Sequence, residues 1–292
     1  MRSGRARRIQ VRMRDGFGPV KAKVPAVGQG TWQLEHEDRA AVVKALRRGL
    51  DLGLTHIDTA EMYGSGRVEE MVAEAIEGRR DQVFLVSKVL PSNASRRGTV
   101  AACQRSLKRL RTDRLDCYLL HWPSSEHPLE DTLTAFEELR RSGAIRSYGV
   151  SNFDEDQLRE SVRIAGRGNI ACNQVLYHLE ERHADAALVP LCEELGIAFV
   201  GYSPFGSGDF PSPQSRGGKV LAEVARAHGA TPRQAALAFL ARRPPLFTIP
   251  RSSKADHTEE NAGALKLKLT EDDLAKIDAA FPVRRRRELP TL

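Results

Sequence analysis

Cysteine is scarce in this chain of 292 residues, and the four that occur, Cys103, Cys117, Cys172 and Cys192, lie far apart. None belongs to a Cys-x-x-Cys pair, and no group of cysteines and histidines has the spacing of a zinc site. The sequence therefore predicts no metal centre. We expect reduced, buried thiols in a cytoplasmic protein.

Long hydrophobic runs are also missing. No stretch approaches the roughly 18 consecutive apolar residues of a membrane span. Arg7 and Arg8 are adjacent, but the residues that follow, IQVRMRDG, are not the apolar run that a twin-arginine or secretory signal requires. We therefore expect no association with a membrane.

The net charge of +7 is concentrated at the two ends of the chain. Residues 1–14 contain six arginines, and the tail over residues 281–292 contains a run of four more, so the chain without these ten arginines carries a net charge of −3. Such ends could contact RNA or anionic surfaces. We interpret them as solvated tails without a specific nucleic-acid partner, because charge excess alone gives only non-specific binding.

Short apolar segments recur along the chain and alternate with polar turns and helical patterns. The eight candidate strands end near Thr31, Asp58, Lys88, His121, Ser151, Gln174, Ser203 and Pro250. Most of these ends are about 23 to 33 residues apart, which is the size of one βα unit. The last interval is longer and leaves room for an inserted loop. Alternating βα units with apolar strands predict a parallel sheet.

The glycine fingerprint of an open dinucleotide-binding sheet, Gly-x-Gly-x-x-Gly, is absent. Gly28 and Gly30 are followed by Thr-Trp-Gln, and Gly206-Ser207-Gly208 lacks the third glycine. An open doubly wound sheet is the alternative, but a closed (β/α)8 TIM barrel, which typically takes about 250 residues, fits eight regular units better. We therefore predict an α/β protein with one barrel domain over residues 1–292.

Further elements are expected before and after the barrel. The sequence RIQVRMRDGFGPVKA predicts a β-hairpin that turns at Asp15-Gly16 and closes the bottom of the barrel. Two additional helices are predicted after the eighth strand. One lies near residues 256–264, and Thr270 can cap the other.

Polar side chains stand at the ends of three consecutive strands. Asp58 ends the second strand and Tyr63 follows in its loop, while Lys88 ends the third strand and His121 the fourth. In a barrel, the chemistry collects where these carboxyl ends meet. A single lysine, histidine, aspartate or tyrosine at such a position more often has a structural role. Four of them at the same end of the barrel favour a shared functional site.

The chemistry of these four side chains suits a general acid that faces a carbonyl group. A nearby ammonium favours the phenolate, so Lys88 is expected to lower the pKa of Tyr63 from about 10. Asp58 could hold Lys88 by an ion pair, and His121 could hydrogen-bond and orient a substrate oxygen. The group could protonate an alkoxide as a hydride arrives, and it needs no metal.

Seven motifs occur in the order of a known family: GLTHIDTAEMYGSG, VFLVSKV, LDCYLLHWP, GVSNF, NQVLYH, GYSPFG and IPRSSKADHTEEN. They resemble the aldo-keto reductases, and in particular the bacterial branch that includes methylglyoxal and diketogulonate reductases. The resemblance implies a (β/α)8 barrel that uses a nicotinamide cofactor without a Rossmann domain. It also implies that Asp58, Tyr63, Lys88 and His121 form the catalytic tetrad, with Tyr63 as the acid.

The resemblance also implies a cofactor site. Ser151, Asn152 and Gln174 match groups that hydrogen-bond the nicotinamide carboxamide, and Tyr202 matches the ring that stacks on the nicotinamide. A place for Tyr202 in the barrel core is the alternative. The expected cofactor contacts are Thr31, Asp58, Ser151, Asn152, Gln174, Tyr202, Ser203, Pro204, Gly206, Ile249, Arg251, Ser252, Ser253, His257, Glu260 and Asn261.

The segment IPRSSK resembles the one that binds the adenosine 2′-phosphate. Arg251 can hold a phosphate with two hydrogen bonds, and Ser252 and Ser253 offer further donors. His257 stands where the family often has arginine, and histidine is a weaker, pH-dependent cation. We expect NADP(H) to be preferred over NAD(H), because Arg251 supplies a permanent charge.

Trp32 and Trp122 are expected to form the walls of a substrate pocket together with Tyr63 and His121. The alternative is that both tryptophans only plug the barrel mouth. Because the tail after Phe281 is short, we expect an open, permissive pocket. We predict the reduction of small aldehydes and ketones such as methylglyoxal by a monomer. The alternative function is that of an NADP(H)-binding, redox-sensing regulatory subunit with slow turnover.

Overall fold

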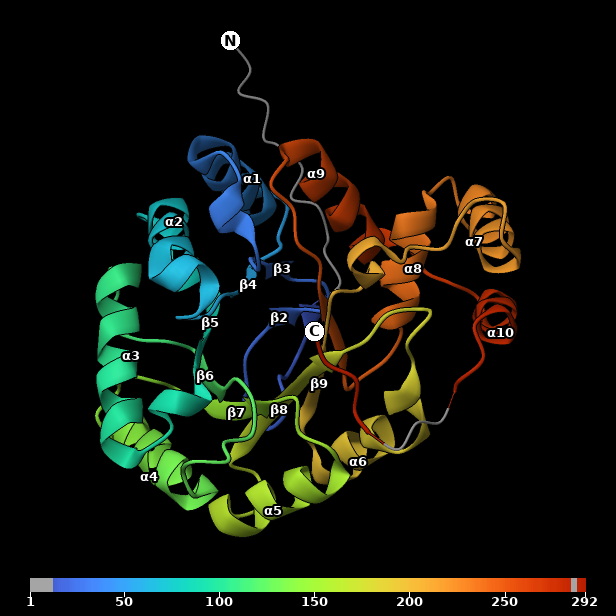
Figure 1. Cartoon of the computed structure of the whole chain (residues 1–292). Coiled ribbons are helices and arrows are strands. Elements are labelled where there is room, and N and C mark those ends of the chain that lie inside the picture. The colour runs from blue at the N-terminus through green and yellow to red at the C-terminus, as the bar shows by residue number, and fades with distance from the viewer. Residues whose placement is uncertain (1–12, 285–287) are drawn as a thin grey trace.

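Eight parallel strands form a closed barrel (Figure 1). The structure is a computed structural model that describes residues 13–284 and 288–292. Around the barrel the strands are β3 Gln29–Gly30, β4 His56–Asp58, β5 Phe84–Val89, β6 Cys117–Leu120, β7 Tyr148–Ser151, β8 Ile170–Leu176, β9 Ala198–Tyr202 and β10 Leu246–Ile249. Gly28 N donates to Thr248 O at 2.8 Å and Gly30 N to Pro250 O at 3.0 Å. The first and last strands therefore meet, and the predicted (β/α)8 barrel is confirmed.

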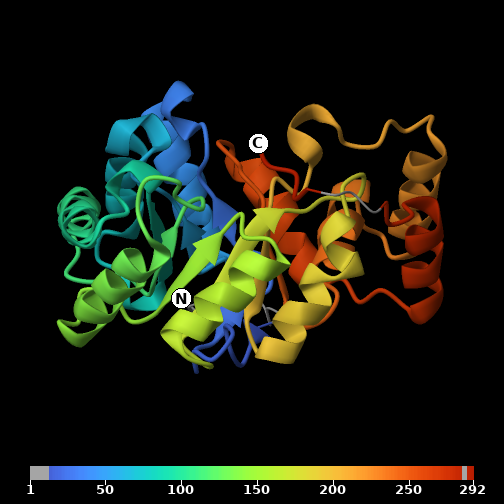
Figure 2. The ribbon, with the colours of Figure 1, turned by 60° about the horizontal axis from the view of Figure 1, so that its bottom comes forward.

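Helices surround the barrel as an outer layer (Figures 1 and 2). They are α1 Arg39–Asp51, α2 Arg67–Ile76, α3 Arg96–Leu110, α4 Leu129–Arg141, α5 Glu155–Ala165, α6 Leu188–Leu195, α7 Arg216–Ala227, α8 Pro232–Leu240, α9 Ala255–Gly263 and α10 Glu271–Ala280. Short 3-10 turns cover Leu34–His36, Tyr63–Gly66, Arg80–Gln82, Pro91–Asn93, His183–Ala186, Gly206–Gly208 and Ala264–Lys266. The two predicted helices after the eighth strand are confirmed as α9 and α10.

A buried apolar stripe and a side-chain cap stabilise several of the helices. On α1, Val42, Leu46 and Leu50 share one face and are buried against the barrel. Thr270 caps α10, and the side chain of Asp273 completes a capping box there. In the described parts of the chain, none of the helices combines the length and the apolar character needed to cross a bilayer.

The interval between β9 and β10 differs from the expected inserted loop, because it contains a helix of its own before α8. Ser215 begins α7 by accepting a hydrogen bond from Gly218 N, and Leu221 and Val224 bury its apolar face. A capped segment with an apolar face gains more from folding as a helix than from staying an irregular loop.

An N-terminal hairpin closes the bottom of the barrel, as predicted. Strand β1 (Met13–Arg14) pairs antiparallel with β2 (Val24–Pro25). The predicted turn position at Asp15-Gly16 is wrong, since Phe17 and Val20 exchange backbone hydrogen bonds of 3.0 and 3.1 Å around Gly18-Pro19. Gly18 has a φ of +58°. A two-residue hairpin loop with a positive φ at its first position favours glycine.

The structure does not test the predictions about the two basic tails in full, nor the prediction of a single domain. The first part of the predicted hairpin, most of the N-terminal basic tail and residues 285–287 of the second tail lie outside the described residues. That one domain covers residues 1–292 stays a prediction. The prediction of free, buried thiols is confirmed for all four cysteines.

His56 is a buried histidine at the bottom of the barrel. Its ring centroid lies 5.6 Å from those of Phe17 and Phe84, and both contacts are edge-on. Neither ring nitrogen has a hydrogen-bond partner among the described residues. Burial therefore lowers the pKa of His56 to about 4, because a charged imidazole would lose its hydration without compensation.

This histidine makes stability depend on pH. The unfolded chain takes up the proton below about pH 6.5, whereas the folded chain resists protonation until about pH 4. The free energy of unfolding should therefore fall by up to about 3 kcal/mol more in the wild type than in His56→Leu over this range. Denaturant titrations of both proteins across the range measure the difference. Equal pH slopes would contradict the prediction.

Candidate active site

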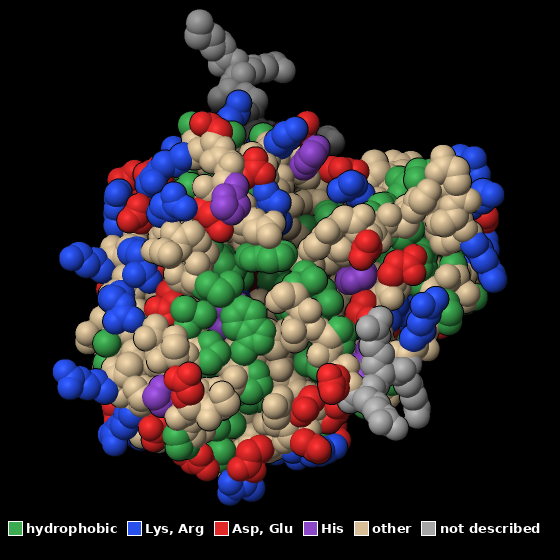
Figure 3. All heavy atoms as spheres, in the orientation of Figure 1, with side chains coloured by type: hydrophobic (Ala, Val, Ile, Leu, Met, Phe, Trp, Pro, Cys, Tyr) green, Lys and Arg blue, Asp and Glu red, His purple; other side chains and the backbone are tan. Residues whose placement is uncertain are grey.

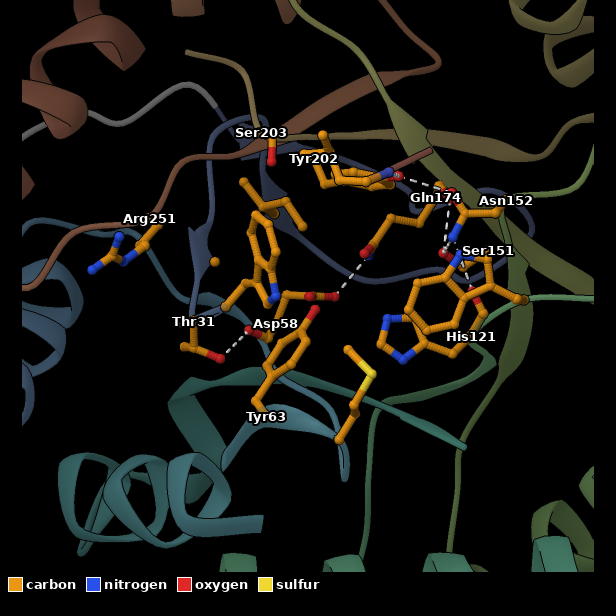
Figure 4. Close-up of a pocket in the computed structure, with 16 residues that line it drawn as sticks. Thr31, Asp58, Tyr63, His121, Ser151, Asn152, Gln174, Tyr202, Ser203 and Arg251 are labelled. Atoms are coloured by element: carbon orange, nitrogen blue, oxygen red, sulfur yellow. Dashed lines mark hydrogen bonds between the residues drawn. The ribbon is translucent and has the colours of Figure 1, made fainter. Parts of the chain in front are cut away.

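A pocket opens at the carboxyl ends of the barrel strands (Figure 4). Its lining consists of Gly30, Thr31, Trp32, Asp58, Met62, Tyr63, His121, Trp122, Ser151, Asn152, Gln174, Tyr202, Ser203, Ile249, Arg251 and Leu292. Hydrophobic side chains gather at the centre of this end of the barrel, and charged side chains lie mainly toward the periphery (Figure 3). Asp58, Tyr63 and His121, which the sequence singles out, are thus brought to one cavity.

Lys88 is the centre of the polar group beneath this pocket. Its ammonium donates to Asp58 Oδ1 at 2.5 Å, to Thr59 O at 3.0 Å and to Tyr63 OH at 3.3 Å. Both Lys88 and Asp58 are fully buried. The predicted ion pair is therefore present, and the tyrosine hydroxyl lies within reach of the same cation.

Local chain geometry directs these side chains to one point. Strands β4 and β5 are adjacent and parallel, so Asp58 and Lys88 end neighbouring strands. Tyr63 begins a short turn in which Gly64, Ser65 and Gly66 have φ values of 55°, 55° and 91°. Such left-handed positions are accessible to glycine at little cost. The turn ends directly at the first residue of α2, which keeps Tyr63 over the strand ends.

The pKa of Tyr63 does not move in the predicted direction. Burial raises the pKa of the phenol, Lys88 lowers it, and the nearby charge of Asp58 raises it again. The net direction is upward, so the expected lowering by Lys88 is outweighed. Burial also lowers the pKa of Lys88, but Asp58 and Tyr63 reverse this, and the pKa of Lys88 is raised overall. Both groups therefore keep their protons at neutral pH.

His121 stands on the other side of Tyr63. Their ring centroids are 5.8 Å apart, and the His121 ring stacks on Trp122 at 3.9 Å. Burial and the charge of Lys88 hold the pKa of His121 well below its usual value. The imidazole is therefore neutral and can donate one N–H to an oxygen in the pocket.

A hydrogen-bond network extends from Asp58 across the barrel. Gln174 Nε2 donates to Asp58 Oδ2 at 2.7 Å, and Ser151 Oγ donates to Gln174 O at 2.9 Å. Asn152 Nδ2 donates to Ser151 Oγ at 3.3 Å, and Tyr202 OH donates to Asn152 Oδ1 at 3.0 Å (Figure 4). The residues that the family resemblance assigns to the nicotinamide thus form one connected surface with the carboxylate that holds Lys88.

The outer cofactor residues are only partly gathered around the pocket. Nine of the sixteen expected contacts line it, and those that do not are Pro204, Gly206, Ser252, Ser253, His257, Glu260 and Asn261. Glu260 accepts a hydrogen bond of 2.6 Å from Thr231 Oγ1, and Asn261 is buried. His257 is exposed. The cofactor roles of all sixteen residues stay predictions.

Sequence reasoning missed three features of the site. Met62 lines the pocket beside Tyr63, and Glu37 forms an ion pair with Arg251. Leu292 also lines the pocket, and its backbone N donates to Tyr202 OH at 3.4 Å. The short tail therefore supplies part of the pocket wall, and the expectation of an open, permissive pocket stays a prediction. Leu289 packs against the core, and this tertiary contact has no local sequence signal.

The barrel and its polar pocket place the chain among (β/α)8-barrel proteins with a site at the carboxyl ends of the strands. The model of the Aldo/keto reductase family matches residues 26–281. The chain therefore belongs to the aldo/keto reductase family, as its motifs indicate.

Relatives match over most of their length. Methylglyoxal reductase YeaE from Escherichia coli (strain K12) is 41% identical over 261 residues, which cover 89% of this chain and 92% of the relative. An aldo-keto reductase from Mycobacterium sp. (strain KMS) is 38% identical over 263 residues, covering 88% and 89%. A Klebsiella pneumoniae aldo/keto reductase crystallised with NADP and acetate aligns with a TM-score of 0.88 at 39% identity, covering 97% and 100%.

Proposed function

We propose that the protein is an NADP(H)-dependent oxidoreductase that reduces small aldehydes and ketones to alcohols by hydride transfer. The observation that carries this proposal is the contact of Lys88 with both Asp58 and Tyr63 beneath a pocket that His121 also lines. The methylglyoxal reductase relative and the NADP-bound structural neighbour support the substrate class and the cofactor. We further propose a monomer that acts in the cytoplasm, where buried free thiols stay reduced.

The donor groups of the pocket fit a nicotinamide dinucleotide. Asn152 and Gln174 present amides, Ser151 presents a hydroxyl, and Tyr202 presents an aromatic ring at the same wall. Arg251 lies at the outer side of the pocket, where a phosphate-bearing ribose would need a cation (Figure 4). When bound, the reduced nicotinamide supplies the hydride.

In this proposal Tyr63 is the general acid. Its raised pKa keeps the phenol protonated at neutral pH. When the carbonyl oxygen becomes an alkoxide, Tyr63 gives it a proton, and the Lys88 ammonium at 3.3 Å stabilises the phenolate that remains. Neutral His121 donates a hydrogen bond that holds the substrate oxygen near Tyr63. Asp58 keeps Lys88 charged and in place.

Tyr63→Phe should lower kcat by roughly 10² to 10⁴-fold, because the acid is removed while the shape of the pocket is kept. NADPH should still bind, which fluorescence titration measures. Tyr118→Phe is the matched control, since Tyr118 is also buried and its hydroxyl has no partner within the described residues. Its turnover should equal that of the wild type.

The same experiment separates the two functions that the sequence leaves open. Rapid turnover that disappears only in Tyr63→Phe supports the reductase. NADPH binding by all three proteins with negligible turnover of any carbonyl would instead indicate the regulatory subunit.

Glu37 should weaken the preference for NADPH, because it already neutralises Arg251. The two side chains form an ion pair and are each about a third exposed. An incoming 2′-phosphate must compete with this carboxylate. Glu37→Gln should tighten NADPH binding by about two- to fivefold and leave NADH binding unchanged, a range set by the modest strength of exposed ion pairs.

Titration of both cofactors against both proteins measures this effect. Glu223→Gln is the control, since Glu223 forms a similarly exposed ion pair with Lys276 on a distant surface. Equal gains for NADPH and NADH in Glu37→Gln would show that Glu37 acts on a part of the site common to both cofactors.

The pocket wall favours neutral carbonyl compounds. Its apolar side chains are Trp32, Met62, Trp122, Ile249 and Leu292. Both charged side chains among the described lining residues are already paired, Asp58 with Lys88 and Arg251 with Glu37. An anionic substrate would therefore have to place its carboxylate in the pocket without a free cation.

Methylglyoxal and benzaldehyde should be reduced with kcat/KM values at least about tenfold above that of pyruvate, a ketone that carries a carboxylate. Steady-state assays with NADPH measure all three values. A pyruvate value equal to that of methylglyoxal would contradict the role of the apolar wall. Negligible rates with every carbonyl would contradict the proposed reductase itself.

A further inference from the structure

Two buried glutamates bracket Tyr63 in the chain, and neither lines the pocket. Glu69 is fully buried and Glu61 is 8% exposed. Carboxylates at such burial are costly unless they are paired and hydrogen-bonded. The chemistry proposed above uses neither, so their place needs another physical reason.

Glu69 joins the helix after Tyr63 to the strand of Lys88. It belongs to the first turn of α2, directly after the Tyr63–Gly66 turn. Its Oε1 accepts a hydrogen bond of 2.6 Å from Ser87 Oγ, and its Oε2 accepts one of 2.6 Å from Arg109 Nε. Ser87 precedes Lys88 on β5, and adjacent strand residues face opposite sides. Ser87 therefore holds β5 from outside the barrel while Lys88 points inward.

Glu61 makes the matching connection on the other side of Lys88. Its Oε1 accepts hydrogen bonds of 2.9 Å from Leu90 N and from Asn93 Nδ2. Its Oε2 lies 3.7 Å from the guanidinium of Arg105. The segment just before Tyr63 is thus tied to the segment just after Lys88.

The two arginines come from one face of α3, which lies beside α2 on the outside of the barrel (Figure 1). Arg105 and Arg109 are four residues apart, so they project side by side. Arg109 also covers Gly66, because a Cβ at that glycine would lie 2.4 Å from the Cδ and Nε of Arg109. The turn that begins at Tyr63 is therefore held down by the same side chain that pairs with Glu69.

We infer that Glu61 and Glu69, held by Arg105 and Arg109, form a clamp that fixes the turn of Tyr63 against the strand of Lys88. These four are positioning residues, since none of them touches the pocket. The clamp maintains the separation of 3.3 Å between Lys88 Nζ and Tyr63 OH. The inference rests on the proposed function, because it concerns how the acid and its cation are held.

Loosening the clamp should change the pH dependence of kcat, which a general loss of protein stability would not do. The interaction between Lys88 and a Tyr63 phenolate weakens with distance, so Tyr63 loses its proton less readily. Reduction should slow, and the alkaline limb of the kcat profile should move to higher pH. The KM for methylglyoxal and the Kd for NADPH should not change, because no clamp residue lines the pocket.

Glu69→Gln tests the clamp with an isosteric change that removes the ion pair with Arg109. We expect kcat to fall about tenfold, with KM and Kd within about twofold of the wild type and the alkaline limb shifted upward. Asp81→Asn is the control, since Asp81 forms an exposed ion pair with Arg114. A wild-type kcat and pH profile in Glu69→Gln would overturn the inference.

Arg109 supplies a second test that does not depend on the folding of Glu69→Gln. Arg109→Lys keeps the charge facing Glu69 and should retain most of kcat, whereas Arg109→Ala should show the loss and the pH shift. If both variants lose kcat equally and neither shifts the alkaline limb, the arginine is only structural and the clamp is refuted.

Ultraviolet titration of tyrosinate separates failure of the clamp from failure of the proposed function. The Tyr63 signal is the difference between each protein and the same protein carrying Tyr63→Phe, and it requires no turnover. If the wild type does not reduce carbonyls, an upward shift of the Tyr63 titration in Glu69→Gln still supports the clamp. An unchanged titration overturns it.

Discussion

The ion pair between Lys88 and Asp58 is the constraint on which the rest of the site depends. Two charges without access to water are tolerated only when their attraction and their remaining hydrogen bonds offset the lost hydration. Lys88 meets this condition through Asp58, Thr59 O and Tyr63, and Asp58 meets it through Lys88 and Gln174. Tyr63 and Gln174 come from different parts of the barrel, so satisfying the pair also brings these parts of the pocket together.

The same ion pair contributes to the protonation states around it. Asp58 and Tyr63 keep Lys88 charged against the effect of burial, and burial together with that charge lowers the pKa of His121 and keeps its imidazole neutral. Tyr63 is subject to opposite influences, since burial favours the phenol and Lys88 favours the phenolate. Its proton is therefore held in the resting site, while the cation needed to stabilise its loss is already in place. In the proposed reduction, an alkoxide would take the proton of Tyr63 while Lys88 stabilises the phenolate that remains.

Features set by local pattern could be predicted from the sequence. The strand ends at Asp58, Lys88 and His121 were identifiable, because short apolar segments at βα spacing mark where each strand stops. The features that the sequence predicted wrongly or not at all depend on tertiary contacts. The net pKa of Tyr63 depends on how deeply it is buried, and the pairing of Glu37 with Arg251 joins residues 214 positions apart. The position of Leu292 at the pocket is also a tertiary contact, and no local sequence pattern indicates it.

The alternation of side chains along β5 explains how the helix layer can influence the pocket without entering it. Ser87 faces outward to Glu69, and Lys88 faces inward to Asp58, although the two are neighbours in the chain. Under the proposed clamp, a displacement of α2 or α3 would be passed through one peptide unit to Lys88. Closely packed interiors transmit such displacements rather than absorb them. In the proposed function, the charged residues Glu61, Glu69, Arg105 and Arg109 lie outside the pocket and still help to hold Tyr63, the proposed acid.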